Sequence, residues 1–295
     1  MASHSQARKI LGLAAALAVG FGLLAPVTPW HAELAESNFQ ANRIRLESFL
    51  FNPTPKTVLV GTSLTGRLRP SYLSDTGLAP VANLGLDGLD PMFGLDFVLS
   101  RPTTPPLVVI EANMLTQSYD SNEATLKSAV EGIQFRLARY VPLLRAQFRP
   151  SSMFYSWLKD HQGGQAGAPA AVPAASDATN PAVAAIPAVS NQAGSDATKE
   201  RVRCQVRSLR ERGARIVLLR MPMNGGAEAG KNPSFAFADE LAREFQLSQV
   251  DLEAELAARG LAICYTDGLH LAAGSARDAS RVLAEVLERE KNATP

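Results

Sequence analysis

A serine, an aspartate and a histidine of this chain are spaced so that they could act together as a nucleophile, an orienting acid and a base. Ser63 follows the short apolar run 57–60, and Asp267 and His270 follow a second apolar run, 261–265. Short apolar runs bounded by turn residues are typical of buried parallel strands. Because the carboxyl ends of parallel strands meet at one edge of a sheet, all three side chains are expected to lie there.

These residue types suit nucleophilic attack on a carbonyl group. A serine hydroxyl is a weak nucleophile and needs a base to accept its proton. His270 fits that role because imidazole titrates near neutral pH, and Asp267 would fix its tautomer and stabilise the imidazolium. Each residue alone also has a structural explanation: Ser63 as a helix cap, Asp267 as a turn cap and His270 as a partly buried structural histidine. The chain has only four histidines, so there are few other candidates for the base.

Two more loop positions extend the pattern. Gly85, in Asn-Leu-Gly, and Asn113, in Glu-Ala-Asn, each come at the end of a predicted strand. In chain order Ser63, Gly85, Asn113 and the Asp-x-x-His sequence resemble the blocks of the SGNH (GDSL-type) hydrolase and acyltransferase superfamily. The resemblance spans residues 57–271.

That resemblance implies a role for each position. Ser63 matches the nucleophile, Asp267 the orienting acid and His270 the base. The backbone N–H groups of Ser63 and Gly85, with the Asn113 side-chain amide, match the donors of the oxyanion hole. No cofactor and no metal ion are implied, and the chemistry is acyl transfer to water or to a sugar hydroxyl.

The sequence departs from the superfamily pattern at three positions. Thr62 replaces the usual aspartate, Glu111 the block-three glycine, and Met114 the aspartate after the asparagine. The replaced aspartate is not a triad member, so the chemistry should survive. The Glu-Ala-Asn block is more similar to the exported, membrane-anchored branch linked to polysaccharide O-acetylation than to secreted lipases.

Strands alternating with helical segments predict an α/β fold: a three-layer α/β/α domain with a mostly parallel five-stranded sheet. We expect helices to include the segments 91–99, 123–157, 198–212, 235–245, 249–259 and 276–291. Strands are expected at about 57–60, 81–86, 107–113, 215–221 and 261–265. In the long helical segment, the spacing of Ile133, Leu137, Tyr140 and Leu144 predicts one face packed on the sheet.

The amino terminus has the character of an export signal. Arg8-Lys9 precedes the uncharged apolar run 10–27, which is close to the length of a spanning helix and is followed by Trp30. We expect an uncleaved inner-membrane anchor, with the remainder of the chain in the periplasm. A cleaved signal peptide is the alternative.

Three regions follow from these patterns. Residues 1–30 would form a cytoplasmic tip and signal-anchor helix, 31–56 a stalk, and 57–295 the SGNH-like domain. An Ala/Pro-rich insertion at 163–195 interrupts that domain and is expected to be disordered.

Composition excludes some classes of protein. With 29 basic and 28 acidic residues the net charge is +1, so nothing indicates binding to nucleic acid. Cys204 and Cys264 lack the companions of a zinc site. They could form a disulfide in an oxidising compartment or remain two separately buried thiols.

Three hypotheses remain. The first is an anchored periplasmic serine acyltransferase or esterase that acts on O-acyl groups of a cell-envelope or exported polysaccharide. In this case the resemblance implies a separate membrane protein that exports acyl groups. The second is a catalytically idle glycan-binding or scaffold protein in an envelope assembly, and the third is a secreted lipid esterase.

Overall fold

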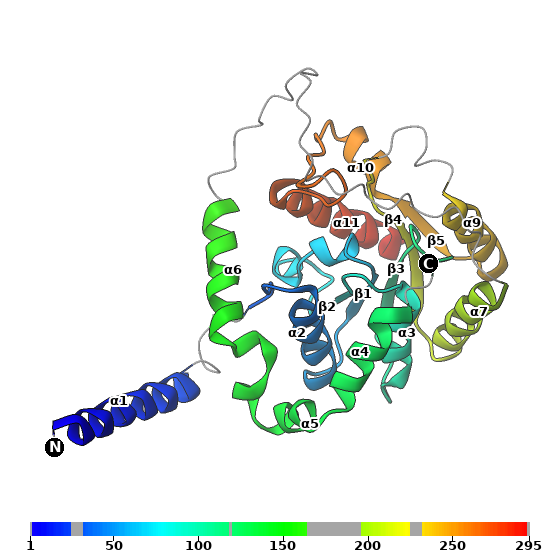
Figure 1. Cartoon of the computed structure of the whole chain (residues 1–295). Helices are drawn as coiled ribbons and strands as arrows, with labels where there is room; N and C mark the ends of the chain where they lie inside the picture. Colours follow the sequence, from blue (N-terminus) through cyan, green and yellow to red (C-terminus); the bar gives the residue numbers. More distant parts are fainter. Residues whose placement is uncertain (1, 25–31, 118–119, 164–195, 225–231, 294–295) are drawn as a thin grey trace.

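A computed structural model describes most of the chain and shows an α/β domain with a helix projecting from it (Figure 1). The described residues are 2–24, 32–117, 120–163, 196–224 and 232–293. The predicted Ala/Pro-rich insertion, apart from its first residue, lies outside them.

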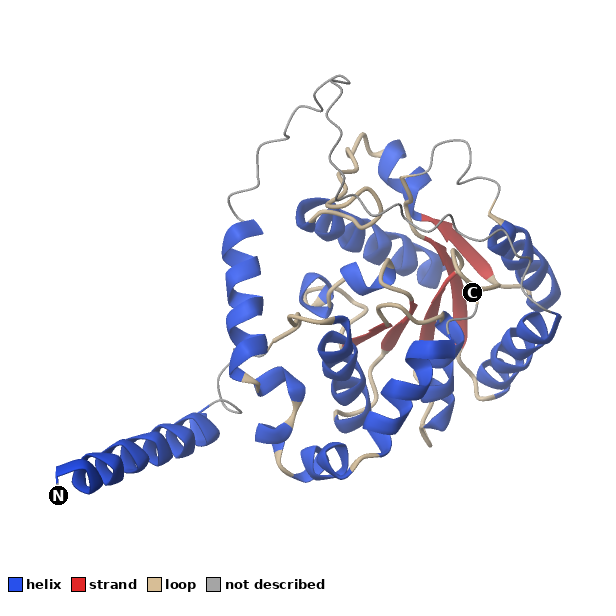
Figure 2. Ribbon diagram, viewed as in Figure 1, coloured by secondary structure: helices blue, strands red, loops and turns tan. Residues whose placement is uncertain are grey.

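All five strands of the sheet are parallel, as predicted, and lie between layers of helices (Figure 2). The strand order is β2-β1-β3-β4-β5, so the direction of winding reverses between β1 and β3. In open α/β sheets ligands bind outside the carboxyl ends of the strands at such a reversal. The strands are β1 (Thr57–Gly61), β2 (Val81–Gly85), β3 (Leu107–Glu111), β4 (Arg215–Arg220) and β5 (Ser248–Asp251).

Alternation along the strands builds a hydrophobic core on each face of the sheet. In β1, Val58 and Val60 belong to one core and Leu59 to the other. The first core is covered by α2 (Asn38–Phe51), α3 (Pro91–Ser100), α4 (Asp120–Glu131), α7 (Asp196–Glu211) and α9 (Pro233–Phe245). The second is covered by α10 (Leu252–Ala258) and α11 (Ala273–Ala293), with the short turns η2 (Thr65–Arg67) and η3 (Pro70–Leu73) nearby. The predicted three layers are therefore confirmed.

The last strand was predicted in the wrong place. β5 is Ser248–Asp251, where we expected the start of a helix, and α10 begins at Leu252. Residues 261–265 form no strand, and Tyr265 makes only an isolated bridge to Leu271. β5 lies at the edge of the sheet and buries only Val250, so its sequence lacks the apolar run of a central strand.

The predicted stalk is also corrected. Helix α2 packs into the domain, with Leu46 and Phe49 in the core, and Arg43 pairs with Glu47 in a buried ion pair at 2.6 Å. Glu47 also accepts a hydrogen bond from the backbone of Ala146. Residues 38–51 are therefore an integral helix of the domain.

The predicted buried face of the segment 123–157 is wrong as well. This segment contains α5 (Ile133–Tyr140) and the start of α6 (Pro150–Gly163), with the short turns η4 (Pro142–Leu144) and η5 (Ala146–Phe148) between them. Helix α5 buries Phe135 and Ala138, whereas Ile133, Leu137, Tyr140 and Leu144 are exposed.

Helix α1 (Ala2–Leu24) lies apart from the domain (Figure 1). Among the described residues, no helix is both long enough and apolar enough to cross a membrane. The membrane anchor at 10–27 therefore stays a prediction.

Candidate active site

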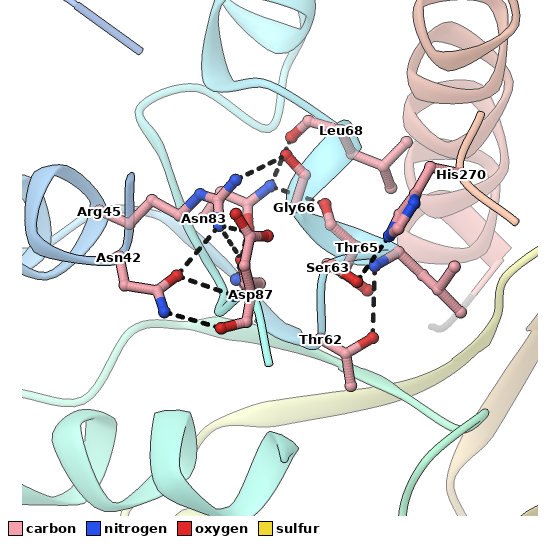
Figure 3. A network of polar contacts seen from close by, with 12 residues as sticks. Asn42, Arg45, Thr62, Ser63, Thr65, Gly66, Leu68, Asn83, Asp87 and His270 are labelled. Carbon is pink, nitrogen blue, oxygen red and sulfur yellow. Dashed lines mark hydrogen bonds and ion pairs between the residues drawn. The ribbon is translucent and has the colours of Figure 1, made fainter. Parts of the chain in front are cut away.

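Ser63, His270 and Asp267 form a continuous chain of hydrogen bonds at the carboxyl edge of the sheet. The Ser63 hydroxyl lies 2.7 Å from His270 Nε2, and His270 Nδ1 lies 2.7 Å from Asp267 Oδ2. Figure 3 shows the imidazole pointing toward the serine. The sequence separation of 207 residues is bridged because Ser63 follows β1 while His270 comes in the loop before α11. The three residues predicted as a triad are thus brought together.

The loop from 266 to 271 positions the imidazole. Asp267 Oδ1 accepts hydrogen bonds from the backbone N–H groups of Leu269 and His270, so the aspartate caps its own turn. Gly268 has a φ of 79°, a left-handed conformation that favours glycine. The cap predicted as an alternative for Asp267 therefore coexists with its contact to the imidazole, since each uses a different carboxylate oxygen.

These contacts keep Asp267 ionised. Partial burial raises the pKa of its carboxyl group, but hydrogen bonds from the backbone and imidazole of His270 and from the Leu269 N–H outweigh this. The net effect lowers the pKa from 3.8 to about 2. A carboxylate beside Nδ1 favours the tautomer with the proton on Nδ1, which leaves Nε2 able to accept the serine proton.

Glu111 holds the loop that carries Ser63. Its carboxyl group is fully buried at the end of β3. The Thr62 N–H donates to Oε2 and the Thr62 hydroxyl donates to Oε1, each at 2.8 Å. It also accepts from the Thr65 hydroxyl at 2.7 Å and the Thr65 N–H at 3.2 Å. These residues flank the serine on both sides, so Glu111 fixes the turn in which Ser63 sits.

Burial has an electrostatic consequence for Glu111. Loss of solvent raises the pKa of its carboxyl group, and the hydrogen bonds from Thr65 and Thr62 oppose this only in part. In the sequence, Glu111 stands out only as a departure from a family pattern. The available signal was an acidic residue ending a wholly apolar strand, next to the strand that leads to Ser63.

Asn113 bonds to the neighbouring strand end. Its side chain is fully buried, and its amide donates to the Met221 carbonyl at 2.9 Å while its Oδ1 accepts from the Met221 N–H at 2.8 Å. Its own carbonyl accepts from the Asn232 side chain. Asn113 thus joins the end of β3 to the residue that follows β4. Its amide nitrogen has a second N–H, so its role as an oxyanion donor stays a prediction.

The backbone N–H of Gly85, also predicted as an oxyanion donor, already has a hydrogen-bond partner. Its N–H donates to Asn83 Oδ1 at 2.6 Å rather than facing Ser63. A side chain at this position would meet the backbone of Gly66 at 2.3 Å, so a glycine is needed for the turn after Ser63 to pack on β2. The Gly85 prediction is therefore corrected: this residue allows a close approach of two backbones.

A polar network joins Asn83 and Gly66 to Arg45 of helix α2 (Figure 3). Arg45 donates to the Gly85 carbonyl at 2.5 Å and to Asp87 Oδ1 at 2.9 Å. Asn83 donates to the carbonyls of Thr65 and Leu68 on the far side of the turn. Arg45 also donates to the Gly66 carbonyl at 3.4 Å, so the segment that follows Ser63 is held from both β2 and α2.

The Ser63 N–H is available as an oxyanion donor. The Ser63 N–H has no hydrogen-bond partner within the described part of the chain, whereas the neighbouring N–H groups of Thr62, Leu64 and Thr65 are all bonded. An unbonded N–H beside a nucleophile is suited to an oxyanion.

The structure shows no second candidate site among the cysteines, the potential metal ligands or the cavity that it describes. Cys204 and Cys264 are both unpaired and exposed, which contradicts both the disulfide and the buried-thiol alternatives. In the ranges that the structure describes, no group of three or more His, Cys, Asp or Glu side chains is arranged to hold a metal ion. A cavity of about 560 Å³ lies by the amino ends of β1, β3 and β4, away from Ser63, and no serine, cysteine or histidine lines it.

Comparisons of the chain with protein-family models, curated proteins and solved structures found no match. Membership of the SGNH superfamily therefore remains a hypothesis that rests on the residues and on the geometry above.

Proposed function

We propose that this protein is a serine-dependent acyltransferase or esterase of the SGNH type. The observation that carries the proposal is the unbroken hydrogen-bonded chain from Ser63 through His270 to Asp267, with 2.7 Å at each link. A nucleophile bonded to a base that is oriented by a third group is the signature of nucleophilic catalysis.

The first half of the reaction uses groups already in place. Ser63 Oγ forms a bond to the carbonyl carbon of an ester while its proton passes to His270 Nε2. The Ser63 N–H donates to the oxygen that becomes negative, and Asp267 stabilises the imidazolium. As the tetrahedral intermediate collapses, the C–O bond to the alcohol breaks and His270 returns the proton to the departing oxygen. Ser63 is left as an acyl ester.

The second half transfers the acyl group. Water or a sugar hydroxyl gives its proton to His270 and attacks the acyl carbon, and the bond to Ser63 breaks with return of the proton to its oxygen. Attack by water makes the protein an esterase, and attack by a sugar makes it a transferase.

The natural substrate that we propose is an O-acetyl group of a cell-envelope or exported polysaccharide. The resemblance of the Glu-Ala-Asn block to the membrane-anchored branch of the superfamily supports this assignment. In this proposal residues 10–27 anchor the chain in the inner membrane, the catalytic domain faces the periplasm, and a separate membrane protein supplies exported acyl groups. The aligned triad favours catalysis over the idle scaffold.

The test is hydrolysis of a small acetyl ester, alone and with an oligosaccharide acceptor, by the full chain and its variants. Ser63→Ala and His270→Ala should lose turnover of the ester or transfer to the acceptor. His161→Ala and Ser74→Ala are matched controls, since both residues are exposed and lie outside the site, and these variants should keep full activity. Unchanged turnover in Ser63→Ala or His270→Ala would refute the triad.

A further inference from the structure

The outer side of α5, η4 and α6 exposes apolar side chains to a degree unusual in the described part of the domain. Seven large hydrophobic residues there are between 37% and 78% exposed, and in residues 32–293 no other large hydrophobic residue that the structure describes is as exposed. Side chains of this kind, when grouped on one face, mark an interaction surface. We call these residues the apolar–basic face: Ile133, Leu137, Tyr140, Val141, Leu144, Phe154 and Trp157.

This surface is not a poorly packed core. Helix α5 already has a buried side, formed by Phe135 and Ala138, and Phe135 packs against Phe51 with ring centroids 4.7 Å apart. Helix α5 is therefore apolar on two sides, of which the domain covers one. On α6, Phe154 and Trp157 stack on each other with centroids 5.9 Å apart, yet both are exposed.

Basic residues outnumber acidic ones around the apolar–basic face, although Glu131 and Asp160 flank the segment and Glu36 lies close to Arg149. Residues 132–159 contain five basic residues and no acidic residue, although the whole chain is nearly neutral. The basic residues are Arg136, Arg139, Arg145, Arg149 and Lys159. A surface of this composition complements an anionic partner. Apolar and aromatic side chains combined with Arg and Lys are typical of segments that lie in the interface of a bilayer.

The path of the chain places the apolar amino-terminal helix beside this face. The backbone N–H of Ala32 donates to the carbonyl of Gln147 in η5, which lies between η4 and α6. Only seven residues separate Leu24, the last residue of α1, from Ala32. Figure 1 shows α1 projecting from the side of the domain on which α6 lies, and its Ile10 and Leu17 are also exposed.

We propose that the apolar–basic face rests on the surface of an anionic bilayer. Tyr140 and Trp157 lie at the level of the headgroups, as such aromatic residues do at membrane interfaces. Arg136 and Arg139 contact lipid phosphates, and Ile133 and Leu137 enter the acyl boundary. This contact orients the domain on the membrane, and it does not depend on the acyl chemistry proposed above.

The two tryptophans of the chain provide a direct test. In a Trp30→Phe background, Trp157 is the sole tryptophan. The full chain is reconstituted in vesicles of phosphatidylcholine and phosphatidylglycerol, with acyl chains that are either ordinary or brominated near the headgroup. Brominated lipid should quench Trp157, and its emission should shift to the blue relative to the protein in detergent. Quenching should decrease in vesicles of phosphatidylcholine alone.

Variants separate the contributions of charge and apolar contact. Arg136→Gln with Arg139→Gln, and Ile133→Ser with Leu137→Ser, should each reduce quenching. Arg281→Gln with Arg289→Gln is the matched control, because both arginines are exposed on α11, and this variant should be quenched like the parent. All of these changes are at the surface, so circular dichroism should show the same melting curve for each.

Two results would overturn the proposal. The first is equal Trp157 emission in ordinary and brominated vesicles while the protein floats with the lipid. The second is a blue shift that follows protein concentration and is independent of lipid composition, which would assign the face to a second copy of the chain.

Discussion

Replacement of Glu111 is the perturbation that most clearly separates the support of the nucleophile from the chemistry itself. In Glu111→Ala the buried N–H groups of Thr62 and Thr65 lose their acceptor, while the two hydroxyls can rotate to other partners. An unsatisfied buried donor costs about 1–3 kcal/mol, so the pair should cost about 2–6 kcal/mol. That is a large part of a typical unfolding free energy of about 5–15 kcal/mol.

Glu111→Gln is the conservative counterpart. The amide oxygen still accepts from the backbone, and the amide nitrogen can donate to a threonine hydroxyl that has rotated. The pKa of Glu111 is raised by burial. The stability that comes from its protonation is therefore present at low pH and is lost as the pH rises through the folded-state pKa. Glu111→Gln should lack that loss.

Urea unfolding as a function of pH and turnover of a small acetyl ester are the assays. Glu111→Ala should unfold at lower urea than the parent. The part that stays folded should show kcat reduced by about 100-fold, since a displacement of a catalytic group by about 1 Å has such an effect. Glu111→Gln should recover most of the activity. Wild-type stability and turnover in Glu111→Ala would refute the role assigned to this carboxyl group.

Two further predictions concern residues around the triad. Asp267→Asn should lower kcat by about 10⁴-fold, because the amide favours the wrong imidazole tautomer. In the wild-type protein, Asp267 should stabilise the fold above pH 3.8. Assays by pH jump should show that this stabilisation is lost only as the pH falls toward about 2. Asn113→Ala should cost about 2–6 kcal/mol in urea unfolding, because the buried N–H and carbonyl of Met221 each lose a partner. A loss of kcat of about 100–1000-fold without a loss of stability would instead support the role of Asn113 as an oxyanion donor.

The parts of the fold that the sequence predicts are those set by local pattern. The central strands β1, β3 and β4 are buried on both faces and therefore read as continuous apolar runs. Once these strands are parallel, residues that follow them must share an edge of the sheet. That is why Ser63 could be placed near its base although the strand expected before His270 does not form.

The sequence does not predict the hydrogen-bond partner of each polar group. Asn113 and Gly85 lie at the predicted positions in the chain, but their hydrogen bonds go to Met221 and Asn83, which a linear pattern cannot specify. The role of Glu111 depends on Thr62 and Thr65, two threonines in the turn that follows the neighbouring strand.

Helix α5 shows a second limit of sequence patterns. Its residues offer two apolar sides, and periodicity alone does not say which of them the domain covers. The spacing of Ile133 and Leu137 correctly indicates one face of a helix. The structure shows that this face points outward, while Phe135 occupies the buried side.

Mass spectrometry of the full chain after brief incubation with an activated acetyl ester tests most directly whether Ser63 is the nucleophile. Acyl transfer through Ser63 predicts a gain of one acetyl group on the peptide that contains this residue. The gain should be absent in Ser63→Ala and present in the control Ser74→Ala. An acetyl group found on another residue, or an equal gain in Ser63→Ala, would contradict the claim that Ser63 is the nucleophile.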